Sequence, residues 1–150
     1  MTYLLDTDLL IYMIRGLKSA TRQAVHRQRA MSLVDRCRKA QEAGDAVGLS
    51  AVTVSELEFG ARHSAQYDAE IAAVRKTLAP FQIYDYEAVD CPVHYGRVRY
   101  ELEAMGQTIG SMDLLIAAHA LSLDATLVTN NQTHFERVSG LKVVNWLRHA

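Results

Sequence analysis

Three acidic residues, Asp6, Glu56 and Asp113, lie far apart in the chain, each near the predicted start of a helix. Carboxylates that face one another repel and raise one another's pKa values, and a divalent cation removes that penalty. A set of ligands that are all oxygen suits Mg²⁺ or Mn²⁺. Such an ion can polarise a phosphoryl oxygen, activate a water molecule and orient an in-line attack. If the fold brings the three acids together, they predict metal-dependent hydrolysis of a phosphodiester.

Each acid also has an ordinary structural explanation. Asp6 precedes a helical segment and can be its N-cap, while Thr53 and Glu56 have the spacing of a capping box. Asp113 can simply complement the dipole of the helix in whose first turn it lies. The prediction of a metal site therefore depends on the three acids as a set. The sequence offers no convincing catalytic triad and no glycine-rich phosphate loop.

Short apolar segments alternate with longer helical ones, which predicts a parallel sheet covered by helices on both faces. The predicted strands are 3–5, 47–50, 81–84, 126–129 and 141–144. The predicted helices are 9–14 with Gly16 as its stop, 19–43, 53–63, 69–78, 88–105 and 111–123. Ligands of open parallel sheets bind beyond the carboxyl ends of the strands. We therefore expect one α/β domain over residues 1–150, with the three acids at strand-to-helix junctions on one edge of the sheet.

Composition excludes several other classes of protein. The chain has 150 residues, of which 49% are hydrophobic, and this is enough for one buried core. Sixteen Lys and Arg residues against seventeen Asp and Glu give a formal net charge of −1, which excludes a strongly basic nucleic-acid coat and an acidic disordered tail.

The cysteines and the hydropathy of the chain predict the cellular compartment in which it functions. Cys37 and Cys91 are far apart and form no C-x-x-C pair, so we expect neither a disulfide framework nor a structural zinc site. The first residues lack the basic region of a signal peptide. No uncharged apolar stretch approaches the roughly 18 residues that a membrane helix needs. We expect a reducing, cytoplasmic setting and no membrane partner.

Four segments carry a family resemblance that spans nearly the whole chain. They are Leu4–Ile11 (LLDTDLLI), Ser50–Gly60 (SAVTVSELEFG), Ile109–Ala120 (IGSMDLLIAAHA), and Leu127–Asn131 (LVTNN) leading to Phe135–Val138 (FERV). In order and spacing they resemble the PIN-domain ribonucleases, specifically the VapC-type toxins of toxin–antitoxin pairs.

The resemblance implies a three-layer α/β/α sandwich with a five-stranded parallel sheet. It also implies a Mg²⁺- or Mn²⁺-dependent endoribonuclease toxin that cleaves RNA with a water molecule activated by the ion. The metal ligands of the family match Asp6, Glu56 and Asp113 here. In the family a cognate antitoxin blocks the site, and the toxin usually forms a homodimer.

The chain departs from the family after its last motif. Many relatives carry a fourth acid near the position of His134, whereas this chain has Asn130, Asn131 and His134. An amide can orient water and a histidine can ligate, but neither supplies the charge of a carboxylate. We therefore predict one tightly held divalent ion, with Asn130 or His134 assisting catalysis; two equal tight sites would refute this.

Residues beside the acids are candidates for holding substrate. Thr7 and Thr129 could orient ligands or water, although a threonine at a strand end is usually structural. Arg99, like Arg97, could hold the scissile phosphate, with a solvated helix face as the alternative. We expect His119 on the apolar helix to be a packed histidine. Two more residues have structural expectations: Ser111 as a helix N-cap and Trp146 as a core or edge anchor.

Positive charge is concentrated at the start of the chain. Residues 1–39 carry eight basic and three acidic residues, a net of +5, and residues 40–150 carry eight basic and fourteen acidic residues, a net of −6. The predicted helix 19–43 is therefore a basic strip that could steer an RNA backbone through Arg22, Arg27 and Arg29. A solvated helix face explains the same residues equally well.

Two other functions remain open. Asp6-Thr7-Asp8 resembles the D-x-D motif of haloacid-dehalogenase-like phosphatases, with Asp6 as nucleophile, but that motif favours Thr or Val at the position of Leu10 and the chain is short for that fold. The second alternative is a PIN-like module that lost its activity with the fourth acid and only binds RNA or a partner.

Overall fold

Five short parallel strands form one sheet in the order β3-β2-β1-β4-β5. The computed structural model describes residues 1–18 and 23–147 of the chain. The strands are β1 (Thr2–Leu5), β2 (Ala46–Ser50), β3 (Gln82–Tyr84), β4 (Thr126–Val128) and β5 (Lys142–Val144). β1 pairs with β2 on one side and β4 on the other. Its carboxyl end therefore lies where the strand order reverses, the usual ligand position in such sheets.

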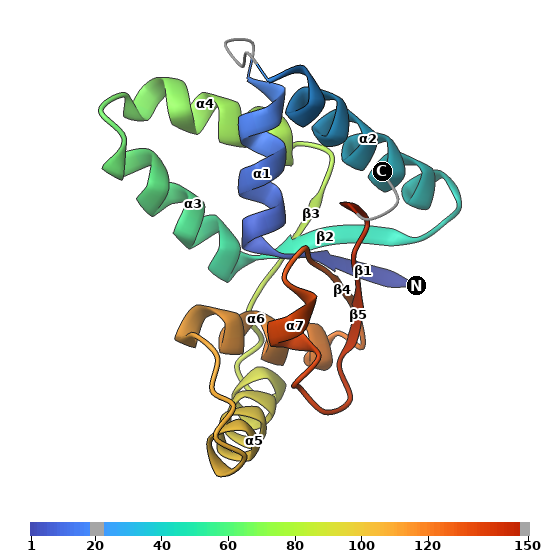
Figure 1. Cartoon of the computed structure of the whole chain (residues 1–150), viewed down its shortest axis with the longest axis vertical. Helices are drawn as coiled ribbons and strands as arrows, with labels where there is room; N and C mark the ends of the chain where they lie inside the picture. The colour runs from blue at the N-terminus through green and yellow to red at the C-terminus, as the bar shows by residue number, and fades with distance from the viewer. Residues whose placement is uncertain (19–22, 148–150) are drawn as a thin grey trace.

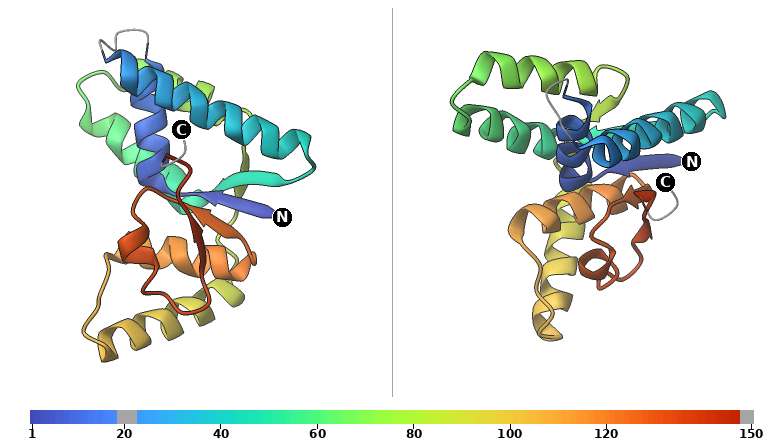
Figure 2. Two further views of the ribbon diagram at one scale, coloured as in Figure 1. Left: turned by 45° about the vertical axis from the view of Figure 1, so that its right-hand side comes forward. Right: turned by 45° about the horizontal axis from the view of Figure 1, so that its top comes forward.

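Helices cover both faces of the sheet (Figures 1 and 2). On one face lie α1 (Thr7–Leu17), α2 (Ala24–Glu42), α3 (Ala51–His63) and α4 (Tyr67–Leu78). On the other lie α5 (Asp90–Ala104), α6 (Ser111–Ser122) and α7 (Gln132–Phe135). The predicted three-layer α/β/α sandwich with a five-stranded parallel sheet is therefore confirmed.

The alternation of side chains along the central strands explains the two cores. Leu5 and Val128 pack into the core under α1 to α4. Their neighbours Leu4 and Leu127 pack into the core under α5 to α7. Because successive strand residues point to opposite faces, a strand that is apolar throughout supplies both layers at once.

The structure corrects the predicted end of the first helix. Gly16 does not stop α1, which continues to Leu17. A Cβ at Gly16 would lie only 2.5 Å from the Cβ of Ala30, so this glycine allows α1 and α2 to approach closely. Its absent side chain serves packing between helices rather than helix termination.

One further difference from the prediction is a short helix after β4. The sequence pattern does not predict α7, because four residues are too short to show a helical period.

The thiols of Cys37 and Cys91 are free and buried, and burial raises the pKa of Cys37 to about 12. Within the described ranges, no helix combines the length and the apolar character needed to cross a bilayer.

Candidate active site at the carboxyl edge of the sheet

The three predicted acids come from three different helices. Asp6 follows β1 directly and caps α1, and Glu56 lies in the second turn of α3, which follows β2. Asp113 is the third residue of α6, and here the expected strand-to-helix junction is wrong because a loop from α5 precedes this helix. α6 runs back along the sheet before β4, so its N-terminus still lies at the carboxyl edge of the strands.

Asp6 is the most buried of these acids, with only 1% of its surface exposed. Its Oδ1 accepts a hydrogen bond from the backbone N–H of Thr7 (2.8 Å), and its Oδ2 accepts one from the hydroxyl of Thr129 (2.8 Å). Burial nevertheless raises the pKa of Asp6 to about 7, with further increases from the charges of Asp113 and Asp8. Asp6 is therefore both a helix cap and a carboxylate that lacks a counter-charge among the described residues.

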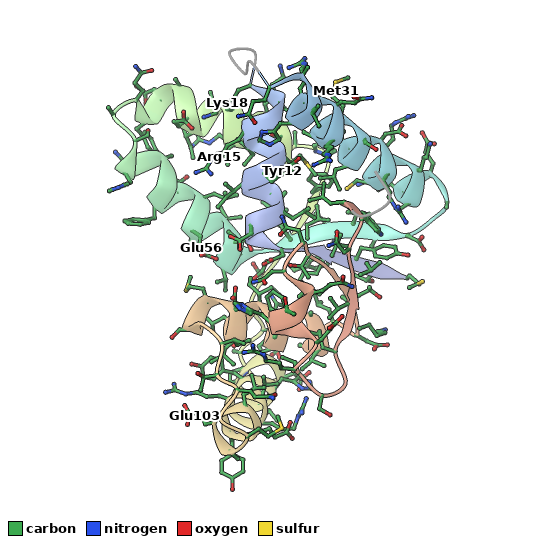
Figure 3. The ribbon with its side chains drawn as sticks, in the orientation of Figure 1. Tyr12, Arg15, Lys18, Met31, Glu56 and Glu103 are labelled. Atoms are coloured by element: carbon green, nitrogen blue, oxygen red, sulfur yellow. The ribbon has the colours of Figure 1, made fainter. Side chains whose placement is uncertain are left out.

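Glu56 accepts a hydrogen bond from the hydroxyl of Thr7, and the predicted capping box does not begin this helix. The N-cap of α3 is Ser50, whose hydroxyl accepts from the N–H of Val52 (3.1 Å). Thr53 therefore lies inside the helix, and its Oγ1 is 2.8 Å from Oγ1 of Thr7. Thr7 in turn donates to Oε1 of Glu56 (2.9 Å). Figure 3 shows Glu56 at the start of α3, beside the N-terminal end of α1.

The carboxylates act on one another electrostatically. Burial is the main cause that raises the pKa of Glu56, and the charges of Asp113 and Asp8 raise it further. Burial also raises the pKa of Asp113, where the charge of Asp8 adds and the neighbouring His134 opposes. The charge of Asp113 thus acts on both Asp6 and Glu56, so the three predicted acids lie in one neighbourhood of the described structure, at wider separations than in an ion-binding cluster.

Asp8 is an acid whose importance the sequence pattern understates. As one of three capping candidates in Asp6-Thr7-Asp8 it has an ordinary explanation, yet its charge raises the pKa of Asp6, Glu56 and Asp113 alike. Its side chain is exposed in the first turn of α1. The signal is present in the sequence, because a single cap cannot use both acids of this tripeptide.

The segment after β4 contributes polar side chains. The hydroxyl of Thr129 that donates to Asp6 also accepts from the N–H of Asn131 (2.9 Å). The amide of Asn131 contacts Nδ1 of His134 (2.9 Å). Asn130, the predicted assistant, is exposed at the same turn, and His134 is close enough to lower the pKa of Asp113. His134 therefore borders Asp113, Asn131 is an additional polar residue of this turn, and Asn130 is placed only by its position next to Thr129.

The guanidinium of Arg99 is already hydrogen-bonded to side chains of its own helix. Its guanidinium donates to Glu103 (2.9 Å) and to the hydroxyl of Tyr95 (3.2 Å) on α5. Arg97 likewise pairs with Glu101. Arg99 also lines a small pocket of about 80 Å³ between α5 and the start of α6. In Figure 3, Glu103 lies in a different part of the molecule from Glu56.

The remaining predicted residues have structural surroundings. Ser111 is not the N-cap of α6, because that position belongs to Gly110. Trp146 is buried between the ring of Tyr3 and the guanidinium of Arg36, as expected of an anchor. His119 is wholly buried, as expected of a packed histidine.

The basic helix α2 begins at the far end of α1 from the acids (Figure 1). Arg27 donates to the carbonyl of Leu17, the last residue of α1 (3.4 Å). Further along α2, Arg38 and Lys39 both pair with Asp35, so part of the positive strip is neutralised on its own helix. Arg22 lies outside the described residues.

A preformed metal cage is not present in this part of the chain. Among residues 1–18 and 23–147, no three His, Cys, Asp or Glu side chains are drawn together closely enough to hold an ion by themselves. Mutual repulsion of four carboxylates is a sufficient physical reason for such a spread arrangement.

Comparisons with known proteins agree with this architecture. The model of the PIN domain family matches residues 3–141. A ribonuclease VapC2 of Haemophilus influenzae is 35% identical over 145 residues, covering 97% of this chain and 98% of that protein. A tRNA(fMet)-specific endonuclease VapC of Shigella flexneri is 29% identical, covering 96% of this chain and 97% of that protein.

A solved structure gives the same result for the fold. The crystal structure of VapBC2 from Rickettsia felis bound to a promoter DNA fragment superposes with a TM-score of 0.82 at 30% identity, covering 97% of this chain and 99% of that chain. These matches exclude the phosphatase alternative. The chain belongs to the PIN-domain family and, within it, to the VapC ribonucleases.

Proposed function

We propose that this VapC-type ribonuclease is a Mg²⁺- or Mn²⁺-dependent endoribonuclease whose ion is held by Asp6, Glu56 and Asp113. One observation carries the proposal. Asp6 is buried, its pKa is raised to about 7, and the charges that act on it are the carboxylates of Asp113, which is distant in the sequence, and of Asp8. A protein keeps such an unfavourable group when a cation compensates it.

The donor set fits a hard divalent cation. All the candidate ligands are carboxylate oxygens, and no described cysteine lies among them. Mg²⁺ retains several waters when few protein groups hold it, so three spread carboxylates are compatible with one ion. When bound, the ion would supply Lewis-acid polarisation of the phosphate and a nucleophilic water. The absence of a fourth acid at His134 supports a single tight ion.

The surrounding side chains have roles in this proposal that follow from their contacts. Thr129 and Thr7 hold the carboxylates of Asp6 and Glu56 through their hydroxyl groups. Both threonines are buried, so orienting the ligands suits them better than direct contact with RNA. Asn130 and His134 are exposed beside the acids and can orient the attacking water or the phosphate.

Two sets of basic residues have roles further from the acids. A phosphate at Arg99 must compete with Glu103 for the guanidinium. The basic α2 could steer RNA toward the protein, which agrees with the exposure of Arg27 and Arg29.

We also propose the partners. Solved relatives are complexes of VapB with VapC, for example those of Rickettsia felis and Salmonella typhimurium. By similarity, we infer that a cognate antitoxin blocks the acidic edge of this chain. We also infer that the toxin forms a homodimer and that its substrate is RNA. A reducing cytoplasm suits two buried free thiols.

The test is cleavage of total RNA by the purified protein. We expect cleavage with Mg²⁺ or Mn²⁺, none in EDTA, and a loss of at least 100-fold in Asp113→Asn. Asp124→Asn is the matched control, because Asp124 pairs with Lys142 on the surface, and it should cleave like the wild type. Cleavage that survives EDTA or Asp113→Asn overturns the mechanism. RNA binding without any cleavage would favour the non-catalytic module instead.

A further inference from the structure

His119 connects two of the helices that carry acids. It lies on α6, six residues after Asp113, and none of its surface is exposed. Its Nδ1 is 2.7 Å from Oγ of Ser50, which is also fully buried. Ser50 is the N-cap of α3, six residues before Glu56. This one hydrogen bond therefore joins the start of the Glu56 helix to the last turn of the Asp113 helix.

The bond between Ser50 and His119 is compatible with a neutral imidazole. Oγ of Ser50 accepts from the N–H of Val52 and keeps its own proton, which it can donate to Nδ1 of His119 when the ring hydrogen is on Nε2. In the other tautomer, Nδ1 donates to the second lone pair of Oγ. Burial lowers the pKa of His119, which agrees with the neutral ring. Nε2 meets no partner of good geometry in the described part of the chain, and the backbone of Asp85 is the polar group that acts on the ring.

Two tyrosines hold the imidazole in this orientation. The rings of Tyr84 and Tyr86, which lie at and after the end of β3, meet His119 edge-on at centroid distances of 6.5 and 5.6 Å. Tyr84 reaches this place because Gly48 has no side chain, since a Cβ there would lie 2.5 Å from the Tyr84 ring. These edge-on rings flank the imidazole whose Nδ1 is directed at Ser50.

A role in packing alone does not explain a histidine at this position. A buried polar ring with one unsatisfied nitrogen costs more than an aliphatic side chain of similar size. This cost in folding free energy is explained if the hydrogen bond fixes the relative position of α3 and α6, which an apolar contact would not fix.

We propose that His119 is a positioning residue, which holds α3 against α6 through Ser50 and so sets the separation of the Glu56 and Asp113 carboxylates. The inference rests on the proposed function of those acids as ligands of one ion. It goes beyond that function by assigning a distinct role to a residue that touches neither ion nor RNA.

The test compares four variants at a temperature where circular dichroism shows each of them folded. His119→Leu removes the hydrogen bond, and His119→Asn keeps an acceptor near the place of Nδ1. Ser50→Ala removes the partner hydroxyl. Val98→Ala is the matched control, because it opens a cavity in the same core without touching the link.

We expect His119→Leu to weaken Mn²⁺ binding about tenfold in calorimetry and to lower kcat about tenfold, with KM for RNA within twofold. His119→Asn should recover both values to within threefold of the wild type, and Val98→Ala should match the wild type. The double variant with Ser50→Ala and His119→Leu should be no worse than Ser50→Ala alone, because both substitutions remove the same link and Ser50→Ala also removes the helix cap to Val52.

Three results would overturn the inference. They are a His119→Leu variant with unchanged Mn²⁺ affinity, an equal loss in Val98→Ala, or no recovery in His119→Asn. If His119→Leu does not fold, Ser50→Ala gives the same readouts. Wild-type protein that binds Mn²⁺ but does not cleave RNA refutes the proposed function alone, and the Mn²⁺ affinities of the variants still decide the role of His119.

Discussion

Replacing Asp6 by Asn should stabilise the protein without its metal at high pH. The raised pKa of Asp6, about 7 against the ordinary 3.8, means that the folded protein binds this proton more tightly than the unfolded chain. Stability therefore falls as pH rises from about 4 to about 7, and the full cost of the ionised carboxylate is present above that range. The side chain of asparagine does not ionise, so Asp6→Asn removes this cost of a buried charge.

The magnitude follows from the same pKa. The difference between the two values, at about 1.4 kcal/mol per pKa unit, corresponds to roughly 4 kcal/mol above pH 7. The amide can still accept from the N–H of Thr7 and can donate to the hydroxyl of Thr129, but it loses about 1 kcal/mol of charge-assisted bonding. We expect a net gain of about 3 kcal/mol, or roughly 6–12 °C in Tm for a chain of this size.

The assay is thermal unfolding in EDTA at pH 8 and at pH 5. Asp6→Asn should raise Tm at pH 8, and the gain should be much smaller at pH 5. Asp35→Asn is the control of opposite sign, because the ion pairs with Lys39 and Arg38 lower the pKa of Asp35. It should lower Tm slightly at both pH values. An Asp6→Asn variant that is equally destabilised at pH 8 and pH 5 would refute the claim that this carboxylate lacks a counter-charge.

Three other predictions concern residues around the acids. Thr129→Val removes the hydrogen bond that lowers the pKa of Asp6, so the pH profile of RNA cleavage should shift to higher pH, and an unchanged profile would contradict this role. The double variant Arg27→Ser with Arg29→Ser should weaken RNA binding and flatten its dependence on salt by roughly one to two units of slope, measured by fluorescence anisotropy; an unchanged slope would leave α2 as a solvated face. His134→Asp adds a carboxylate beside Asp113 and should create a second, weaker Mn²⁺ site in calorimetry. A single Mn²⁺ site in that variant would contradict the explanation given for the single ion of the wild type.

The strands and both cores could be predicted from the sequence because they depend on local apolar runs. The pairs Leu4 and Leu5, or Leu127 and Val128, stand in short runs whose apolar character alone indicates buried strands. The predicted stop at Gly16 is wrong because contact with Ala30, 14 residues away, decides what that glycine does. Tertiary contacts of this kind leave no periodic signal.

The candidate site could likewise be predicted only in part. The acids themselves are visible in the sequence as residue types, whereas their hydrogen-bond partners are not. The capping box at Thr53 has the correct spacing, but Ser50 begins the helix one turn earlier and leaves Thr53 free to contact Thr7. The link between Ser50 and His119 joins residues 69 positions apart, a separation that a single sequence cannot resolve.

Calorimetric titration of Mn²⁺ into the purified protein at pH 7.5 tests the central claim most directly. The account predicts one tight site in the wild type, which is lost or weakened at least 100-fold in Asp113→Asn and unchanged in the surface control Asp124→Asn. Equal binding by the wild type and Asp113→Asn, or two equal tight sites in the wild type, would contradict it.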